Sequence, residues 1–157
     1  MRRAPFLAAA LSLLACPGLM AQAPTSASAP AAKENPDNCI FCKIVAGKAP
    51  SKKVYEDSYV LAFWDIRPRA KVHLLVIPKQ HVASLKELDD LPVESRAALL
   101  SACVKVARDQ GILDEGFRVI SNAGKDAGQS VFHLHFHVVG GEKLREDAIS
   151  MDAVKVP

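Results

Sequence analysis

The feature that most constrains the fold of this chain is an alternating run at residues 129–139, which reads QSVFHLHFHVV. Residues two apart share a face in an extended strand, so this run predicts a half-buried strand over 131–139. Its polar side would carry three imidazoles: His133, His135 and His137. Its other side would carry core residues: Leu134, Phe136 and Val138. Histidine is not a favoured strand residue, so three in register indicate a metal site or a phosphate site.

Four further short strands are predicted from β-formers between turn signals, at residues 53–56, 59–64, 72–77 and 117–121. A short helix is expected over 39–46, stopped by Gly47 and Pro50, and a longer one over 93–110, opened by Pro92 and ended by Gly111. Residues 85–91 are expected to form a loop or short turn. Five short strands in largely hairpin order with two helices predict an α+β domain on an antiparallel sheet.

The start of the chain has the pattern of an export signal. Arg2 and Arg3 precede an apolar stretch at 6–15 that is too short to span a bilayer, and a small-residue cleavage pattern ends at Ala21. We therefore expect a signal peptide over 1–21 and an exported, periplasmic product. The alternative is a lipoprotein box ending at Cys16, which would anchor the protein to a membrane through a lipid on that cysteine.

Residues 22–38 are rich in Ala, Pro and Ser without an apolar period, so they predict a disordered tether before a folded domain over 39–157. The whole chain has 20 basic and 17 acidic residues. Removal of Arg2 and Arg3 with the signal leaves 18 basic against 17 acidic residues. A nearly neutral mature chain argues against nucleic-acid binding and against electrostatic attraction to a membrane surface.

Three cysteines lie outside the signal. Cys103 falls in the longer predicted helix and is expected to be a small buried apolar residue. Cys39 and Cys42 form a Cys-x-x-Cys pair, which in an exported protein suits a disulfide and equally suits two thiolates on one metal ion. The spacing alone leaves both possibilities open.

The loop at 122–130 leads directly into the histidine run. Gly124 and Gly128 allow backbone amides to turn toward an anion, and Asn122, Gln129 and Ser130 add neutral donors. Taken alone, the segment is as compatible with a plain loop. Joined to the histidines, it becomes a candidate cradle for a phosphate or an oxyanion.

Taken together, these motifs resemble the histidine triad (HIT) proteins, most closely the Hint branch of nucleoside phosphoramidases. The resemblance is carried by residues 39–44 (CIFCKI), 59–66 (YVLAFWDI), 73–81 (HLLVIPKQH) and 129–137 (QSVFHLHFH), and covers nearly all of 39–140. It implies a HIT-like fold with a five-stranded antiparallel sheet and two helices. It also implies a homodimer in which the two sheets are continuous.

The resemblance implies hydrolysis of nucleoside 5′-monophosphate derivatives, in particular purine nucleoside phosphoramidates such as adenosine phosphoramidate. His135 would attack the α-phosphorus and form a nucleotidyl-histidine that water then cleaves, with no cofactor in the chemical step. His137 would bind phosphate oxygens, while Ser130 and Gln129 would stabilise developing charge and assist the leaving amine.

The same resemblance assigns nucleotide-binding roles. Asp65 would accept hydrogen bonds from the ribose hydroxyls, although by position alone it is a turn residue. Asn122 would contact the phosphate, and His73 would lie beside this group. The base slot would be walled by Ile40, Phe41, Ile44, Phe63 and Ile66, which by spacing alone are core residues.

Four residues are left for a structural metal. The family pattern implies that Cys39, Cys42, His81 and His133 hold a zinc ion, with the Cys39–Cys42 disulfide as the alternative. Two thiolates and two imidazoles make a closed tetrahedral set.

Other functions remain open. Within the same family they are a dinucleoside polyphosphate hydrolase and a nucleotidyl transferase. Outside it they are a hydrolase with a catalytic zinc on His133, His135 and His137, and a nucleotide- or zinc-binding module with little activity. The tail after Gly141 lacks the tryptophan of animal Hint proteins, which leaves the leaving group undetermined.

Overall fold

The computed structural model describes residues 36–144. The predicted signal peptide, the alternative lipid site at Cys16, nearly all of the predicted tether and the tail from residue 145 lie outside the described residues. Within 36–144, no helix is both long enough and apolar enough to cross a membrane.

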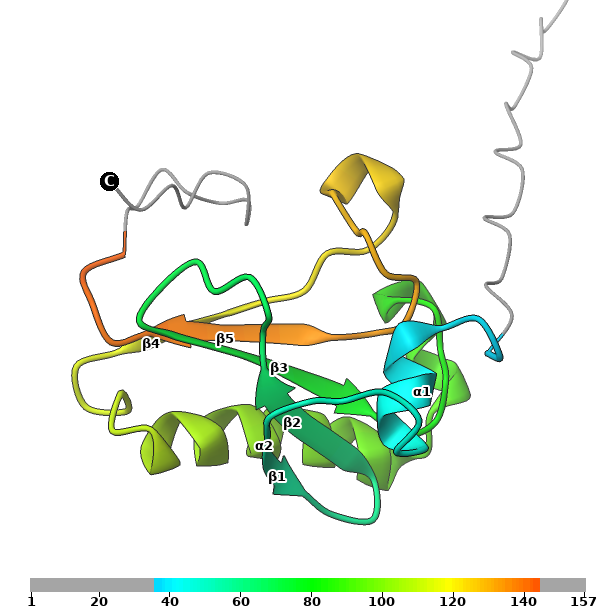
Figure 1. Cartoon of the computed structure of the whole chain (residues 1–157), viewed down its shortest axis with the longest axis horizontal. Coiled ribbons are helices and arrows are strands. Elements are labelled where there is room, and N and C mark those ends of the chain that lie inside the picture. Colours follow the sequence, from blue (N-terminus) through cyan, green and yellow to red (C-terminus); the bar gives the residue numbers. More distant parts are fainter. Residues whose placement is uncertain (1–35, 145–157) are drawn as a thin grey trace, which may run out of the picture. The chain divides into compact units, whose positions relative to one another are not determined.

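The described chain folds as an α+β domain on one antiparallel sheet, as predicted (Figure 1). The strands are β1 (Lys53–Glu56), β2 (Val60–Trp64), β3 (Val72–Pro78), β4 (Phe117–Ile120) and β5 (Phe136–Gly140). Their order across the sheet is β1-β2-β3-β5-β4, and each neighbouring pair is antiparallel. Strand β3 is therefore central, and all seven of its residues are buried.

The two faces of the sheet are covered by different helices. The long helix α2 (Val93–Asp109) packs in one core with alternate residues of the central strands, including Leu74, Val76 and Val138. The short helix α1 (Ile40–Val45) packs in a second core with the intervening residues, including Leu75 and Ile77. Because successive side chains of a strand point to opposite faces, these two cores lie on opposite sides of the sheet.

Helix α2 confirms its predicted boundaries to within one residue. Pro92 precedes its first turn, and Gly111 follows it with a positive φ of 68°, which favours glycine. Cys103 faces the core, as predicted, and burial raises the pKa of its thiol to about 12. That cysteine is therefore an inert packing residue.

Residues 85–91, expected to form a loop or short turn, contain a 3₁₀ helix at Leu85–Asp90. It begins with a capping box: the Ser84 hydroxyl accepts a hydrogen bond from the Lys86 amide, and the Glu87 carboxylate accepts one from the Ser84 amide. A second short 3₁₀ turn, Lys125–Ala127, lies in the loop before the histidines.

The prediction of one strand over 131–139 is wrong in its first half. Strand β5 begins only at Phe136, and residues 131–135 are irregular. The His133 amide donates to the Val131 carbonyl at 2.9 Å, which folds the chain sharply, and the Leu134 amide donates to the Val82 carbonyl at 2.7 Å, outside the sheet ladder. The three histidines therefore do not share one strand face.

Candidate functional site

The histidines of the run divide between two clusters. His133 lies with Cys39, Cys42 and His81, and His137 lies with His73 and Asp65. The ligand atoms of each group lie within 4.8 Å of one another. The ring of His135 packs against the ring of His137, with the ring centroids 4.9 Å apart and the ring planes at 75°.

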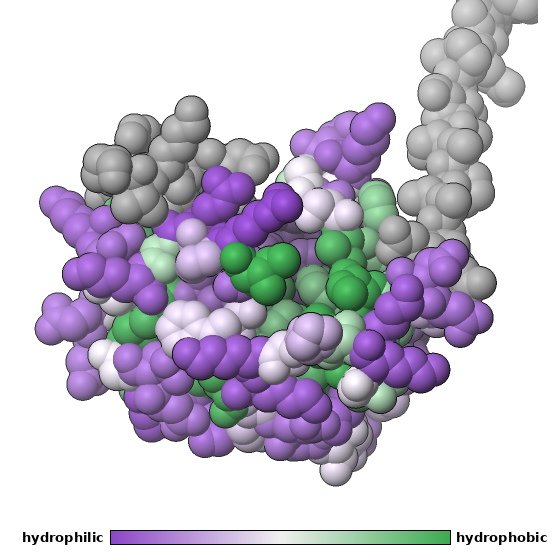
Figure 2. Space-filling model, in the orientation of Figure 1, coloured by the Kyte–Doolittle hydropathy of each residue, from purple (hydrophilic) through white to green (hydrophobic). Residues whose placement is uncertain are grey.

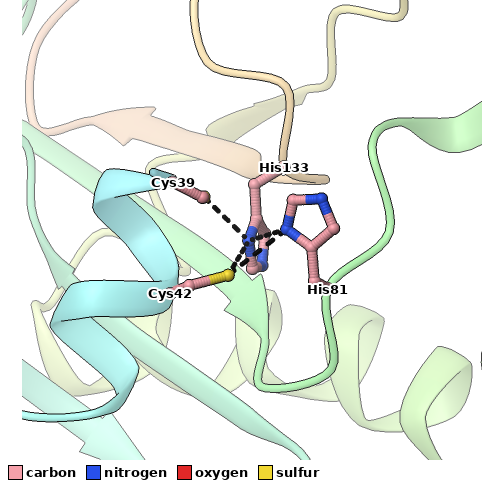
Figure 3. Close-up of side chains that lie close together, drawn as sticks. All are labelled: Cys39, Cys42, His81 and His133. Atoms are coloured by element: carbon pink, nitrogen blue, oxygen red, sulfur yellow. Dashed lines mark hydrogen bonds between the residues drawn. The ribbon is translucent and has the colours of Figure 1, made fainter. Parts of the chain in front are cut away.

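The first cluster joins three separate segments (Figure 3). Cys39 caps helix α1 and Cys42 lies within it, His81 follows β3, and His133 lies in the irregular segment before β5. The Nδ1 atom of His133 is 3.4 Å from the Cys39 sulfur, 3.5 Å from the Cys42 sulfur and 3.2 Å from Nδ1 of His81. The Cys42 sulfur is 3.3 Å from Nδ1 of His81.

These distances fit a tetrahedral zinc site. Zinc bonds to sulfur and to imidazole nitrogen set ligand-to-ligand distances of about 3.3 to 3.8 Å in a regular tetrahedron. The His133 ring donates from Nε2 to the Pro78 carbonyl at 2.9 Å, which leaves the Nδ1 lone pair directed at the cluster. Burial lowers the pKa of His133 to about 4, so its ring is neutral, as a ligand must be. No disulfide joins Cys39 to Cys42 in the described structure.

The ring of His135 is held by the backbone of the residue two before it. Its Nδ1 atom lies 2.6 Å from the His133 carbonyl oxygen. A carbonyl oxygen can only accept, so the proton is on Nδ1 and the lone pair is on Nε2. The ring is 5 % exposed, and burial lowers its pKa, partly offset by the His133 carbonyl and by Asp65. His135 is therefore a neutral imidazole with a lone pair at a defined atom.

Residue 133 thus links the first cluster to His135: its side chain faces the two sulfurs and its carbonyl fixes the tautomer of His135. The motif spacing gave no sign of this connection, because it depends on the irregular backbone of residues 131–135.

The second cluster lies on the face of the sheet that α1 covers. His73 on β3 and His137 on β5 are joined by a hydrogen bond of 2.9 Å between Nε2 of His73 and Nδ1 of His137. Asp65, just after β2, places Oδ2 at 3.4 Å from the same Nε2 atom and at 4.0 Å from Nδ1 of His137. Burial, with smaller effects of His135 and His73, lowers the pKa of His137 to about 3. The His137 ring is therefore neutral near pH 7.

The glycine loop is closed by the side chain of Gln129. Its carbonyl oxygen accepts from the Gly124 amide at 2.8 Å, and its amide nitrogen donates to the carbonyls of Ala83 and Val131 at 2.7 and 3.0 Å. The structure therefore places Gln129 inside the loop, where it sets the loop's shape. Ser130 is exposed next to it, and Asn122 is half-buried.

The five residues predicted to wall the base slot differ in their burial. Phe41, Ile44 and Phe63 are buried, as their spacing predicted. Ile40 is 44 % exposed and Ile66 is 90 % exposed, so for these two the prediction of core packing is wrong. The reason for Ile66 is the turn that Asp65 makes by accepting the Arg67 amide on Oδ1 at 2.8 Å.

On the face drawn in Figure 2, strongly hydrophobic surface lies close to strongly hydrophilic surface. Beside Asp65, an almost fully exposed isoleucine is followed by the basic residues Arg67 and Arg69.

Comparison with known proteins gives consistent matches. The profile of the HIT domain matches residues 46–144. The chain is 49 % identical over 107 residues to Protein hit of Bacillus subtilis, covering 66 % of this chain and 70 % of that protein. It is 42 % identical over 104 residues to an uncharacterized HIT-like protein of Helicobacter pylori, covering 66 % of this chain and 97 % of the relative.

Solved structures agree with this match. A HIT family hydrolase from Clostridium thermocellum superposes with a TM-score of 0.68 at 45 % identity, covering 71 % of this chain and 96 % of that one. A HIT family hydrolase from Legionella pneumophila superposes with a TM-score of 0.67 at 41 % identity, covering 70 % and 98 %.

Proposed function

Because this chain belongs to the HIT domain family, we propose that it hydrolyses nucleoside 5′-monophosphate derivatives through a covalent intermediate on His135. The substrates we propose are purine nucleoside phosphoramidates such as adenosine phosphoramidate. The observation that carries this proposal is the 2.6 Å contact between Nδ1 of His135 and the His133 carbonyl, which leaves Nε2 as a neutral nucleophile.

The chemical steps balance without a cofactor. The Nε2 lone pair of His135 forms a bond to the α-phosphorus while the bond from phosphorus to the amine nitrogen breaks, and the amine leaves with a proton supplied from Ser130 or water. Water then attacks phosphorus and gives one proton to Ser130 or to solvent, replacing the one taken by the amine; the bond to Nε2 breaks, and the nucleoside monophosphate is released. His137 holds a phosphoryl oxygen during both steps.

The arrangement favours this mechanism over a catalytic zinc on the three histidines of the run. Nδ1 of His133 faces the two sulfurs, and Nδ1 of His135 donates to a carbonyl. Nδ1 of His137 is hydrogen-bonded to His73. The three histidines are not among the groups of described residues whose ligand atoms lie within 4.8 Å of one another, so they offer no common point for a metal-bound water.

Nucleotide binding is proposed on the same side of the sheet. Asp65 would accept the ribose hydroxyls, Asn122 would contact the phosphate, and Ser130 would assist the leaving amine. The base would lie against Ile66 and Ile40, whose exposed side chains are available to a ligand, with the buried Phe41, Ile44 and Phe63 behind them. Gln129 would act by holding the loop rather than by direct contact.

An assay of product release tests the function. We expect adenosine 5′-phosphoramidate to yield AMP and ammonia, and a diadenosine polyphosphate to be cleaved at least about tenfold more slowly, a difference of about 1.4 kcal/mol in the barrier. Faster cleavage of the polyphosphate would support the dinucleoside polyphosphate hydrolase instead. No turnover of either compound would support a binding module.

We further propose that Cys39, Cys42, His81 and His133 hold a structural zinc ion. The metal would tie helix α1 to the segment before β5 and would take no part in the chemical step. Export through residues 1–21, with lipidation of Cys16 as the alternative, also stays a prediction.

A homodimer is proposed from the surface of α2 and β4. Strand β4 is an edge of the sheet, so its outer side can pair with another strand. Helix α2 exposes Leu100 and Val104, and β4 exposes Val119. Val119 pairs with Val138, so it lies on the face of the sheet that α2 covers. Leu100 and Val104 are four apart and share one face of the helix. Pairing of two copies through β4 would cover this apolar surface and make the sheet continuous.

Light scattering tests the dimer. We expect the wild-type protein to have twice the chain mass, and Leu100→Glu to be monomeric because a buried, unpaired carboxylate is costly at an interface. Lys105→Glu, a charge change on the same helix at an exposed position, should remain dimeric. A monomeric wild-type protein, or a dimeric Leu100→Glu variant, would contradict the proposed interface.

A further inference from the structure

A continuous line of hydrogen bonds runs from the backbone of the loop after β2 to His137. The Arg69 amide lies 3.1 Å from Nδ1 of His73, and Nε2 of His73 lies 2.9 Å from Nδ1 of His137. His73 is 1 % exposed, so its partners are these protein atoms. The three groups come from a loop, β3 and β5, which the sheet register holds together.

The direction of each hydrogen bond follows from the bond between the Arg69 amide and Nδ1 of His73. A backbone amide can only donate, so Nδ1 of His73 accepts and the neutral ring has its proton on Nε2. Burial lowers the pKa of His73, which favours the neutral ring. Nε2 also faces Oδ2 of Asp65 at 3.4 Å, and a carboxylate is an acceptor. A proton on Nε2 is therefore donated to Nδ1 of His137 and also faces the carboxylate of Asp65.

We infer that the Arg69 amide, acting through His73, fixes His137 as a neutral hydrogen-bond donor at Nε2, the opposite tautomer from His135. This inference deepens the proposed function and rests on it for the identity of the group that His137 meets. His73 and the Arg69 amide are positioning groups, since they act through His137.

The two neighbouring rings then offer complementary atoms to a substrate. His135 presents a lone pair on Nε2 and His137 presents an N–H on Nε2, with the ring centroids 4.9 Å apart. Neither Nε2 atom bonds to another described residue, and neither is completely buried. A phosphorus attacked by the first nitrogen would have one of its oxygens held by the second.

The same line of bonds limits what His137 can do. To replace a proton given up from Nε2, His137 would take one on Nδ1 from His73, and His73 would need one from the Arg69 amide. A backbone amide does not supply a proton under these conditions, so the line ends there. His137 therefore holds a phosphoryl oxygen, and the proton for the leaving amine comes from Ser130 or water.

Under this assignment Asp65, His73 and His137 would not bind a cation, although their ligand atoms lie within 4.8 Å of one another. Nε2 of His73 carries a proton, so it has no lone pair for a cation, and its Nδ1 lone pair is taken by the Arg69 amide. The competing arrangement puts the proton of His73 on Nδ1, directed at the nearby Arg67 carbonyl. That arrangement would break the bond from the Arg69 amide, reverse the bond between the two rings and leave His137 with a lone pair on Nε2.

Nitrogen NMR of the protein labelled with ¹⁵N-histidine decides between the two arrangements. Long-range ¹H–¹⁵N spectra report which ring nitrogen carries the proton, and single substitutions assign the five histidines. We expect protons on Nε2 of His73 and His137 and on Nδ1 of His135. A proton on Nδ1 of His137 would overturn the inference. The NMR measurement needs no turnover, so its outcome does not depend on whether the proposed function is correct.

Two substitutions of His73 test the positioning role. His73→Gln can keep an amide donor near the place of Nε2, whereas His73→Leu removes it. We expect His137 to keep its Nε2 proton in the Gln variant and to become a mixture of tautomers in the Leu variant. We expect kcat to fall by about 10- to 100-fold in the Leu variant, the effect of one hydrogen bond to a charged group, and to recover largely in the Gln variant.

The dependence on leaving group tests which atom His137 contacts. Loss of a bond to a phosphoryl oxygen should slow amine and aryl oxide leaving groups by similar factors in His73→Leu. A loss confined to the amine would show that His137 serves the leaving group, and would overturn that part of the inference. Equal losses in the Gln and Leu variants, with unchanged tautomers in both, would overturn the positioning role. If the Leu variant does not fold, the wild-type spectra still decide.

Discussion

His135→Ala should reduce kcat for adenosine phosphoramidate by at least about 10³-fold, because it removes the only atom that we expect to bond to phosphorus. Removal of a covalent nucleophile costs more than loss of a single binding contact. Steady-state release of AMP measures the effect. Lys105→Ala, which removes an exposed ion pair with Asp109, should leave kcat unchanged.

A second variant separates chemistry from structure at this position. Asparagine can place its side-chain N–H near Nδ1 and keep the bond to the His133 carbonyl, but it has no nucleophilic nitrogen. His135→Asn should therefore match the wild-type unfolding midpoint more closely than His135→Ala and be equally inactive. Substantial activity in either variant would rule out the covalent mechanism.

Loss of the proposed zinc site should have the largest effect on stability. We expect about one zinc ion per chain in the wild-type protein and none in Cys42→Ser, with a fall in Tm of more than about 10 °C. The reason is that the metal would bond four side chains from three segments into one unit, in addition to the hydrogen bonds from Leu134 to Val82 and from His133 to Pro78. Elemental analysis and thermal unfolding measure the two quantities.

Cys103→Ala is the matched control, because Cys103 is buried on α2 and belongs to neither cluster. It should keep the zinc and lose only the packing of one sulfur atom. A wild-type protein that lacks zinc and whose mass is lower by two hydrogen atoms would instead show the Cys39–Cys42 disulfide. That result would contradict the metal site without touching the assignment of His135.

The zinc site should also influence activity, through residue 133. Its side chain would be a ligand, while its carbonyl orients His135 at 2.6 Å. Loss of the metal frees the segment 131–135, so Cys42→Ser should show a lower kcat even at temperatures where the variant is folded.

Much of the fold follows from local sequence. The apolar spacing of α2, with Pro92 before it and Gly111 after it, predicted the helix to within one residue. The runs that became β1, β2, β3 and β4 were predicted to within a residue or two, because each consists of β-formers between turn residues. Hydrophobic periodicity and turn chemistry are local properties, so sequence alone reports them well.

The site was less predictable, because its geometry depends on contacts between distant segments. The alternation of residues 131–139 favours a strand, but the bond from the Leu134 amide to Val82 draws that residue out of the ladder. His133 consequently turns toward α1 while His137 stays on β5. Ile66 shows the same limit, because a turn set by Asp65 exposes a residue that hydrophobicity alone would bury.

The tautomers of the histidines are the feature of the site that the sequence predicts least. They depend on one carbonyl at residue 133 and one amide at residue 69, and neither group is distinguished by its side chain. Residue types therefore suggested a phosphate site, whereas the backbone indicates which ring is the nucleophile.

The central claim is tested most directly by trapping the intermediate. The protein is mixed with a nucleoside phosphoramidate that has a fast leaving group, quenched in alkali to preserve a bond between phosphorus and imidazole nitrogen, and digested. Tandem fragmentation is needed because His133, His135 and His137 are close enough to share a peptide. The account predicts a nucleotidyl adduct on His135; an adduct on either neighbouring histidine, or release of product with no adduct at any time, would contradict it.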